Sequence, residues 1–438
     1  MKVSEKIIRY GLIALLALSL YLSYKIWLSP NARTYLGDNQ ATVVANASNV
    51  RKADEVFLPT RLVWVKSPED IKMLSSENAI SKIHESVIKG RYGEVSGTTY
   101  DDDQAFLEAA DIRHGVEMSY FGSFQLYEYA KMFNLKIDLK GIADGKDVYF
   151  TKVQWDFDNS RIRFINTRRH QIYEASMTME LDPIEQKLQQ LDEAWMPMTA
   201  ENRLSSLQYN TSEKVKLKLY SYIASTQTYT VFRNAFFQDP ENVKSSEESR
   251  DTVLYGGSET MHVQENRQIV EFQGQLETTT EGEEDIYDRS YGYISRLGTG
   301  IGYLRFFDRD KDGITYRTFI EGFPVFGDAY QGEVTFDIRD SGTGVPQVDI
   351  HSSLNTIQIP IPSDETVELA SSSEVIAELT AKGAQTDLWQ TMVIGYQRQD
   401  VKNADGIVDM VPTWYIKYDD NWYSYQQLLD HLAQKEGA

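Results

Sequence analysis

The sequence predicts an α+β protein in which one N-terminal transmembrane helix precedes a multi-domain region of antiparallel sheets with packed helices. Three observations support this prediction. The chain has 438 residues, 41% of them hydrophobic and 12% aromatic, which is enough apolar material for more than one core. An apolar run near the N-terminus is long enough to cross a bilayer. After it, strand and helix patterns alternate along the chain.

The apolar run extends from Tyr10 to Leu28 and holds a single charge, Lys25, near its distal end. Basic residues precede the run, which predicts that residues 1–9 lie in the cytoplasm and that the bulk of the chain lies outside the cell membrane. The alternative is a cleaved secretory signal. The segment after Lys25 lacks the small residues that signal peptidase reads, so we expect the helix to be kept as a single-pass anchor.

The anchor also has a candidate face for contact with other transmembrane helices. Ser19 and Ser23 are spaced as a small-xxx-small pair, and Gly11, Ala14 and Ala17 add further small side chains. Helices in lipid pair through close packing and polar contacts, because apolar side chains gain little by leaving lipid for one another. The alternative is that small residues are only tolerated in a helix that anchors and does nothing else.

A polar tether is expected over residues 29–54, and an N-terminal α+β domain over 55–198. Periodicity in this domain predicts a strand, a helix before Gly90, a second helix after an N-cap at Ser123, a hairpin and a third helix. In that order, these elements are expected at Arg61–Val65, Ile80–Ile88, Phe124–Phe133, Val153–Phe164 and Asp182–Leu191.

A middle, mostly β domain is expected over residues 199–280 and a C-terminal α+β domain over 281–438. Two capping boxes, Ser371-x-x-Glu374 and Ser424-x-x-Gln427, predict the last two helices, and Gly383 is expected to end the first of them. The strands expected in these domains are Leu217–Ile223, Thr228–Phe232, Gln268–Phe272, Tyr303–Phe307, Ile314–Ile320, Ile357–Ile361, Trp389–Tyr396 and Pro412–Tyr418.

Composition and charge exclude several classes of function. The net charge is −21, and because residues 1–28 carry +3, the remainder carries −24. Nucleic acid is therefore excluded as a partner, since phosphate contacts need concentrated Lys and Arg. The body is also expected to be repelled by anionic lipid headgroups and wall polymers. The absence of cysteine excludes disulfides, thiolate zinc sites and thiol nucleophiles.

No motif in the sequence indicates catalysis, a cofactor or a metal. The six histidines have neither HxxxH nor HxH spacing, and no Gly-x-Ser-x-Gly elbow occurs. The glycines of Gly298–Gly302 lack the Lys-Ser/Thr of a phosphate-binding loop, so this segment is interpreted as a flexible entry to the following strand. We therefore expect a protein that is not an enzyme and that holds no cofactor.

Four segments, in their order along the chain, resemble the YycH (WalH) family. They are Phe57–Arg61 (FLPTR) at the start of the body, the hairpin Phe164–Tyr173, Tyr316–Phe326 (YRTFIEGFPVF) and Pro412–Ile416 (PTWYI). None is a catalytic signature, and all are interpreted as packing motifs. The resemblance covers essentially the full length, including the short cytoplasmic start and the single anchor.

The resemblance implies an accessory regulator of a YycG/WalK-type sensor histidine kinase in low-GC Gram-positive bacteria. It implies an exported region of three domains, of which the last two have the shape of the partner protein YycI. It further implies a complex with the kinase and a YycI-like protein, formed largely through transmembrane helices, that controls cell-wall metabolism. The family's effect on the kinase differs in sign between lineages, and no active-site residues exist in it to carry over.

Two other classes of function stay open at this point. The first is an extracytoplasmic binding protein that senses a wall fragment or a peptide, which predicts a concave aromatic pocket. The second is a wall hydrolase, which predicts clustered acid and base side chains. The aromatic content alone does not separate a pocket from a core.

The segment Asp308–Gly313 (DRDKDG) is expected to bind no calcium. Its acidic residues Asp308, Asp310 and Asp312 match the start of an EF-hand loop, but Phe319 stands where that loop needs a bidentate Glu. We interpret the segment as an acidic turn between two strands. Calorimetry with calcium is expected to detect no binding at physiological concentrations. Stoichiometric micromolar binding that Asp310→Ala abolishes would contradict this expectation.

Overall fold

The protein is described from a computed structural model that covers residues 51–436 except 202–207, 249–250, 276–285, 311–312, 340–345 and 403, together with the helical residues Leu15 and Ser19. The chain divides into two compact units, Met1–Ala47 and Ser48–Ala438. All the strands of the described residues belong to the second unit. No helix within the described part of the chain is both long and apolar enough to cross a membrane. The predicted anchor lies outside the described residues apart from Leu15 and Ser19, so it stays a prediction.

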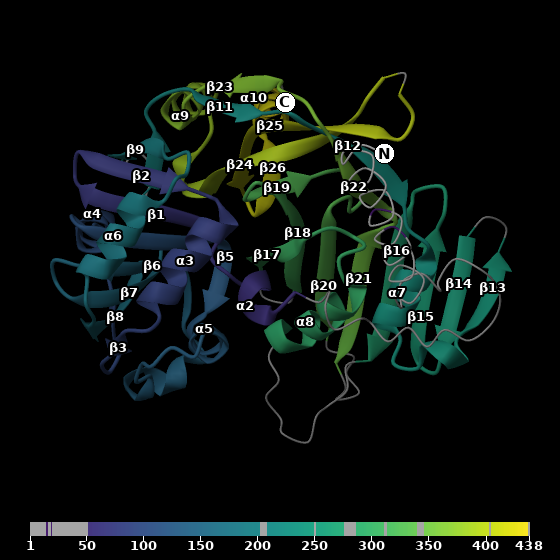
Figure 1. The fold of residues 1–438 in the computed structure, drawn as a ribbon, viewed down its shortest axis with the longest axis horizontal. Coiled ribbons are helices and arrows are strands. Elements are labelled where there is room, and N and C mark those ends of the chain that lie inside the picture. The colour runs from purple at the N-terminus through teal and green to yellow at the C-terminus, as the bar shows by residue number, and fades with distance from the viewer. Residues whose placement is uncertain are drawn as a thin grey trace, which may run out of the picture. The chain divides into compact units, whose positions relative to one another are not determined.

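The first sheet has ten strands, and the pairings within it are antiparallel (Figure 1). Its strand order is β10-β9-β2-β1-β5-β6-β7-β8-β3, and β4 also pairs with β8. Both faces are buried, because Leu62 and Trp64 of β1 belong to one core while Val63 and Val65 belong to another. The strands are β1 (Arg61–Ser67), β2 (Asp70–Leu74), β3 (Arg91–Tyr92), β4 (Ser96–Thr99), β5 (Gly115–Gln125), β6 (Tyr149–Asp156), β7 (Arg161–Asn166), β8 (Gln171–Thr178), β9 (Met196–Glu201) and β10 (Gln208–Thr211).

The second sheet has fourteen strands in the order β13-β14-β15-β16-β21-β20-β18-β19-β24-β25-β12-β22, with β17 on β18 and β26 on β25. Its β19–β24 pair is parallel. A separate two-stranded ribbon joins β11 (Val215–Lys218) to β23 (Thr366–Leu369). The strands of the second sheet are β12 (Tyr220–Thr226), β13 (Lys244–Glu248), β14 (Asp251–Gly256), β15 (Glu259–Gln264), β16 (Ile269–Gln275), β17 (Leu304–Arg309), β18 (Gly313–Ile320), β19 (Phe323–Phe326), β20 (Glu333–Arg339), β21 (Gln347–Ser353), β22 (Asn355–Ile361), β24 (Trp389–Asp400), β25 (Ile407–Tyr418) and β26 (Asn421–Ser424).

Helices cover both sheets and complete the α+β fold that the sequence predicts. The helices that follow strands of the first sheet or precede them are α2 (Ala53–Val56), α3 (Glu77–Val87), α4 (Asp103–Ala110), α5 (Leu126–Met132) and α6 (Asp182–Gln190). Those in the later part of the chain are α7 (Tyr229–Phe236), α8 (Ile286–Leu297), α9 (Ser372–Ala381) and α10 (Tyr425–Glu436). The described residues from 51 onward lie in one compact unit, so the predicted division into three exported domains stays a prediction.

The elements with strong local signals lie where the sequence predicts them. Helix α9 begins with a complete capping box, in which the Ser371 side chain accepts from the backbone of Glu374 and the Glu374 carboxylate accepts from the backbone of Ser371. At the start of α10 the backbone N–H of Ser424 donates to the Gln427 side chain over 2.8 Å. The segment Asp308–Gly313 connects the antiparallel strands β17 and β18, as predicted.

Three predictions about local structure are wrong. The segment Thr228–Phe232 forms the N-cap and the start of helix α7 and not a strand. Phe232 and Phe236 lie one helical turn apart in α7, and the ring of Phe236 packs against β16, 5.6 Å from that of Phe272. Ser123 does not cap a helix, since β5 continues to Gln125 and α5 begins at Leu126. The expected strand Leu217–Ile223 is divided between β11 and β12, which pair with different strands.

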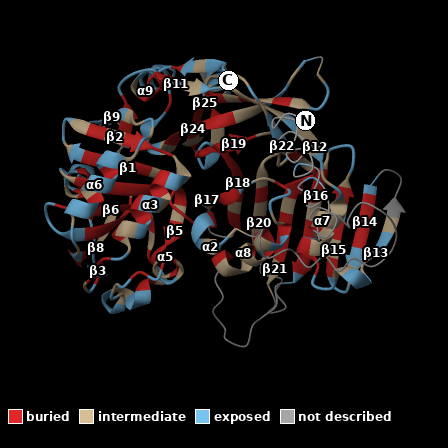
Figure 2. Cartoon of the chain, viewed as in Figure 1, coloured by how far each residue is buried: buried red, intermediate tan, exposed pale blue. Residues whose placement is uncertain are grey.

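One aromatic cluster joins the two sheets. Figure 2 colours the buried residues of both sheets red. Phe57, just before β1, lies at its centre, with ring centroids 5.8–5.9 Å from those of Phe124, Tyr287, Phe306 and Tyr316. These four partners come from β5, α8, β17 and β18. The core of the first sheet therefore continues into the core of the second, with Phe57 at the centre of ring contacts that also include Phe124–Tyr287 and Phe124–Phe306.

Replacement of Phe57 by alanine is expected to lower the free energy of unfolding by about 3–5 kcal/mol, because it leaves a cavity among aromatic rings that have no room to collapse. The measurement is urea unfolding of the full chain in detergent. Tyr303→Ala is the matched control, since that ring is 61% exposed, and a change within about 0.5 kcal/mol is expected. Equal losses in both variants would contradict the central place of Phe57.

Buried His84 of α3 predicts a loss of stability in acid. Its side chain is 2% exposed, its Nε2 lies 2.7 Å from the Tyr129 hydroxyl, and burial lowers its pKa to about 3. The unfolded chain takes up the proton near the ordinary value of 6.5, so the stabilisation is complete above pH 6.5 and decreases as the pH falls toward 3.

The free energy of unfolding is therefore expected to fall between pH 7 and pH 4.5 by about 2–3 kcal/mol more in the wild type than in His84→Gln. Glutamine keeps a polar partner for Tyr129 but does not titrate. The measurement is urea unfolding of both proteins at the two pH values, so that the carboxylates common to both cancel in the comparison. The same pH dependence in both proteins would contradict the assignment of this loss of stability to the low pKa of His84.

Candidate functional site

Of the site residues predicted on the anchor, the structure describes only Ser19. Gly11, Ala14, Ala17 and Ser23 lie outside the described residues, and Ser19 is described only as an exposed helical residue. Their proposed contact with other transmembrane helices therefore stays a prediction. The candidate site that the structure does describe lies in the unit Ser48–Ala438.

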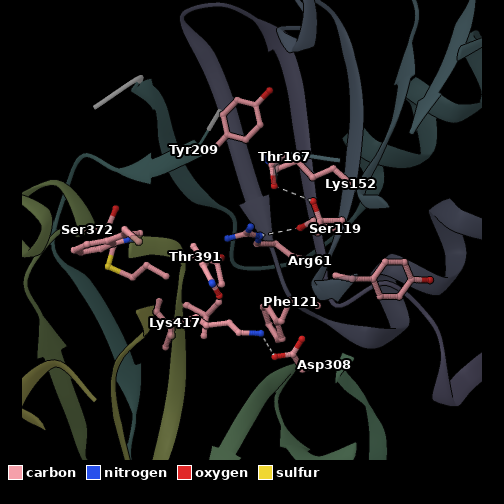
Figure 3. Close-up of a pocket in the computed structure, with 18 of the residues that line it drawn as sticks. Arg61, Ser119, Phe121, Lys152, Thr167, Tyr209, Asp308, Ser372, Thr391 and Lys417 are labelled. Atoms are coloured by element: carbon pink, nitrogen blue, oxygen red, sulfur yellow. Dashed lines mark hydrogen bonds and ion pairs between the residues drawn. The ribbon is translucent and has the colours of Figure 1, made fainter. Parts of the chain in front are cut away.

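The segment Phe57–Arg61 builds one wall of that site. After Phe57, the Thr60 hydroxyl donates to the carbonyl oxygen of Ser119 over 3.0 Å. In β1, Arg61 lies opposite Ser119 of β5, and its Nε donates to the Ser119 hydroxyl over 3.1 Å. These bonds hold the Arg61 side chain out from the sheet, and Figure 3 shows its guanidinium group reaching into a cavity.

The cavity has a volume of about 260 Å³ and lies between the first sheet and strands of the second (Figure 3). Strands β1, β5, β6 and β10 form one wall, and strands β17, β24 and β25 with the start of α9 form the other. Aromatic and sulfur-containing side chains line it beside the polar ones. Its lining residues include Arg61, Phe121, Lys152, Tyr209, Asp308, Met392, Trp414 and Lys417.

The lining is cationic although the chain is strongly acidic. Among the described lining residues, two carboxylates, Asp308 and Asp387, face five Lys and Arg side chains. Those five are Arg61, Lys152, Arg168, Arg309 and Lys417. A local excess of positive charge inside a body of opposite sign focuses the electrostatic potential on the cavity.

Four of the five cations have protein partners. Lys152 pairs with Glu117 over 3.2 Å, Arg168 with Asp420 over 2.9 Å, and Lys417 with Asp308. Arg309 lies 4.9 Å from the ring centroids of Tyr149 and Tyr287.

Arg61 differs from the other four. Its hydrogen bond goes to the neutral hydroxyl of Ser119, and among the described residues no carboxylate forms an ion pair with it. Burial lowers the pKa of Arg61, and the charge of Glu117 opposes that shift. Because a guanidinium stays protonated in proteins, Arg61 presents a half-buried positive charge to the cavity.

A buried network of one ion pair and one hydrogen bond lies behind this wall and determines its charge. Glu117 is 1% exposed, pairs with Lys152 and accepts a hydrogen bond from Gln154 over 2.9 Å. The Lys152 ammonium also lies 5.6 Å from the centroid of the Tyr209 ring. Burial lowers the pKa of Lys152 and Glu117 counteracts this. The ion pair and the hydrogen bond of Glu117 thus go to Lys152 and Gln154, while its charge acts on Arg61 without an ion pair between the two side chains.

The sequence alone does not predict this cavity. Arg61 belongs to the FLPTR segment, which is interpreted from the sequence only as a packing motif, and Asp308 belongs to a predicted turn. The walls come from residues such as Arg61 and Lys417 that are more than three hundred positions apart, so no local spacing indicates them. The one available signal is that FLPTR ends in a charged residue directly after a buried run.

The segment Asp308–Gly313 contributes two residues, Asp308 and Arg309, to the lining of the cavity. The Asp308 carboxylate pairs with Lys417 and accepts a hydrogen bond from the Trp422 indole over 3.3 Å, while Asp310 accepts from the backbone N–H of Gly313 over 2.7 Å. Asp312 lies outside the described residues. No group of three or more potential metal ligands is found in the part of the chain that the structure describes.

Comparisons with known proteins identify the family. Residues 206–435, slightly more than half of the chain, match the family model "YycH protein, C-terminal domain". The fold is similar to the crystal structure of YycH from Bacillus subtilis, with a TM-score of 0.66, 14% sequence identity, and coverage of 86% of this chain and 97% of that chain. A comparison with curated proteins finds no match. The family match and the shared α+β fold lead to one conclusion: the chain belongs to the YycH family.

Proposed function

We propose that the protein is a membrane-anchored, extracytoplasmic regulator of a YycG/WalK-type sensor histidine kinase, and that it acts with a YycI-like partner on cell-wall metabolism. The observation that carries the proposal is membership of the YycH family, whose members are regulatory accessory proteins. The strongly acidic body fits this role, because it stays soluble beside a membrane and away from anionic wall polymers.

Regulation needs a contact through which the protein favours one state of the kinase over another. We propose the anchor helix for that contact. Its apolar run of 19 residues carries Ser19 and Ser23 one helical turn apart, which allows close approach and polar contact with a second helix in lipid. The exported unit would then set the position of the anchor.

A second candidate function is extracytoplasmic binding of a small ligand, and the cationic cavity at Arg61 is the observation that favours it. The two functions are compatible, since a regulator can respond to a ligand that binds one of its states more tightly.

The double variant Ser19→Leu with Ser23→Leu is expected to insert normally but to lose the kinase and the YycI-like partner. Leucine is at least as compatible with the membrane as serine, but its bulk prevents close approach of a second helix. The measurements are the membrane level of the variant, co-purification of the kinase and its partner, and expression of a kinase-controlled gene.

The matched control is Ser19→Ala with Ser23→Ala, which keeps the small size and removes only the hydroxyl groups. This control is expected to retain most of the co-purification if packing dominates. A leucine variant that inserts, keeps both partners and signals as the wild type does would contradict the anchor contact. Failure of the wild-type chain to co-purify with any histidine kinase would contradict the regulatory proposal itself.

A further inference from the structure

We propose that the cavity between the two sheets is a binding site for a small organic anion, whose carboxylate or phosphate group is held by Arg61. This inference does not depend on the kinase proposal. It states which class of ligand the cavity binds, and membership of the family does not state this.

The Arg61 guanidinium is placed to receive an oxyanion. Its Nε is bound to Ser119, so the two terminal nitrogens are directed away from β1 and into the cavity (Figure 3). A guanidinium presents a planar fork of donors that matches the two oxygens of a carboxylate or phosphate. An oxyanion at this position supplies the negative partner that the described protein residues do not supply.

The surrounding charges also favour an anion. Glu117 is held by Lys152 and Gln154 behind the wall, and Asp308 is held by Lys417 and Trp422 on the opposite side. These two carboxylates, of which Glu117 is buried and Asp308 partly buried, are therefore engaged by other groups. Three of the five lining cations are paired with carboxylates, and Arg61 keeps a positive charge, without an ion pair among the described residues, by which an incoming anion is stabilised.

The dimensions of the cavity limit the size and character of the ligand. A volume of about 260 Å³ lies just below the usual range for small-molecule pockets, roughly 300–1,000 Å³. Tyr209, Met392 and Trp414 offer apolar surface beside Arg61. The ligand is therefore a small molecule with one anionic group and a short, partly apolar remainder, such as a dipeptide or the phosphate ester of a small alcohol.

The acidity of the rest of the chain selects small anions over polymers. Outside the first 28 residues the net charge is −24, so a polyanion or an anionic membrane surface is repelled before it reaches the cavity. A single carboxylate or phosphate meets that repulsion only weakly at physiological ionic strength, because charges beyond about 8 Å are largely screened.

The test is isothermal titration calorimetry on the full chain in detergent, with three probes. These are inorganic phosphate, N-acetyl-alanyl-alanine, and the C-terminal amide of the same dipeptide. We expect saturable one-to-one binding of phosphate, of the dipeptide acid, or of both, and at least tenfold weaker binding of the amide. The better of the two anions identifies whether the natural ligand carries a phosphate or a carboxylate.

Two variants locate the binding. Arg61→Met is expected to weaken it at least tenfold. Thr391→Phe, which fills the cavity from the opposite wall while Arg61 is retained, is expected to have a similar effect. The matched control is Arg161→Met, an exposed arginine of the same sheet that pairs with Glu174 and does not line the cavity, and its binding is expected to equal that of the wild type.

Circular dichroism and thermal unfolding establish that each variant is folded, and if Arg61→Met does not fold, Thr391→Phe carries the test. Failure of both anions to bind the wild-type chain would overturn the proposal. Binding that is unchanged in the folded cavity variants would overturn it as well, because the anion would then bind elsewhere. Neither result bears on co-purification of the kinase, so the two proposals fail separately.

Discussion

The structure depends on the five residues Phe57–Arg61, which connect the two sheets. Phe57 places its ring among aromatic side chains from both sheets, and the carbonyl groups of Leu58 and Pro59 accept hydrogen bonds over 3.0 Å from Arg305 of the second sheet. Arg305 is fully buried, and burial lowers its pKa to about 10. A charge buried in this way is tolerated only while its hydrogen bonds are kept. The chain segment that opens the body is therefore held tightly on the second sheet before β1 begins.

The same segment explains why the cavity exists where it does. Its first residue, Phe57, packs between the two sheets. Its last residue, Arg61, is held by a hydrogen bond to Ser119 and faces the cavity. Packing and charge are thus combined in one short sequence, in which the apolar end fixes the position of the charged end. A site built in this way on strands and a rigid core is well suited to present a cation in a fixed orientation.

Much of the fold is predictable from the sequence, because many of its signals are local. The capping boxes at Ser371 and Ser424 and the hairpin of β6 and β7 depend on neighbouring residues, and the structure confirms them. Helix α7 is not predictable in this way, since its aromatic residues favour strands until Phe272 of a distant strand packs against them. The cavity is less predictable still. Arg61 and Lys417 come together only through tertiary structure, and the residues predicted on the anchor lie almost wholly outside the described part of the chain.

The unit Ser48–Ala438 is expected to unfold cooperatively, with its two large sheets joined at Phe57–Arg61. Native-state hydrogen exchange with mass spectrometry, applied to the full chain and to Phe57→Ala, tests this most directly. Buried amides of β6 in the first sheet and of β21 in the second should exchange with the same free energy of opening, and both should lose the same amount in the variant. Two different free energies in the wild type, or a loss confined to one sheet, would contradict the cooperative junction.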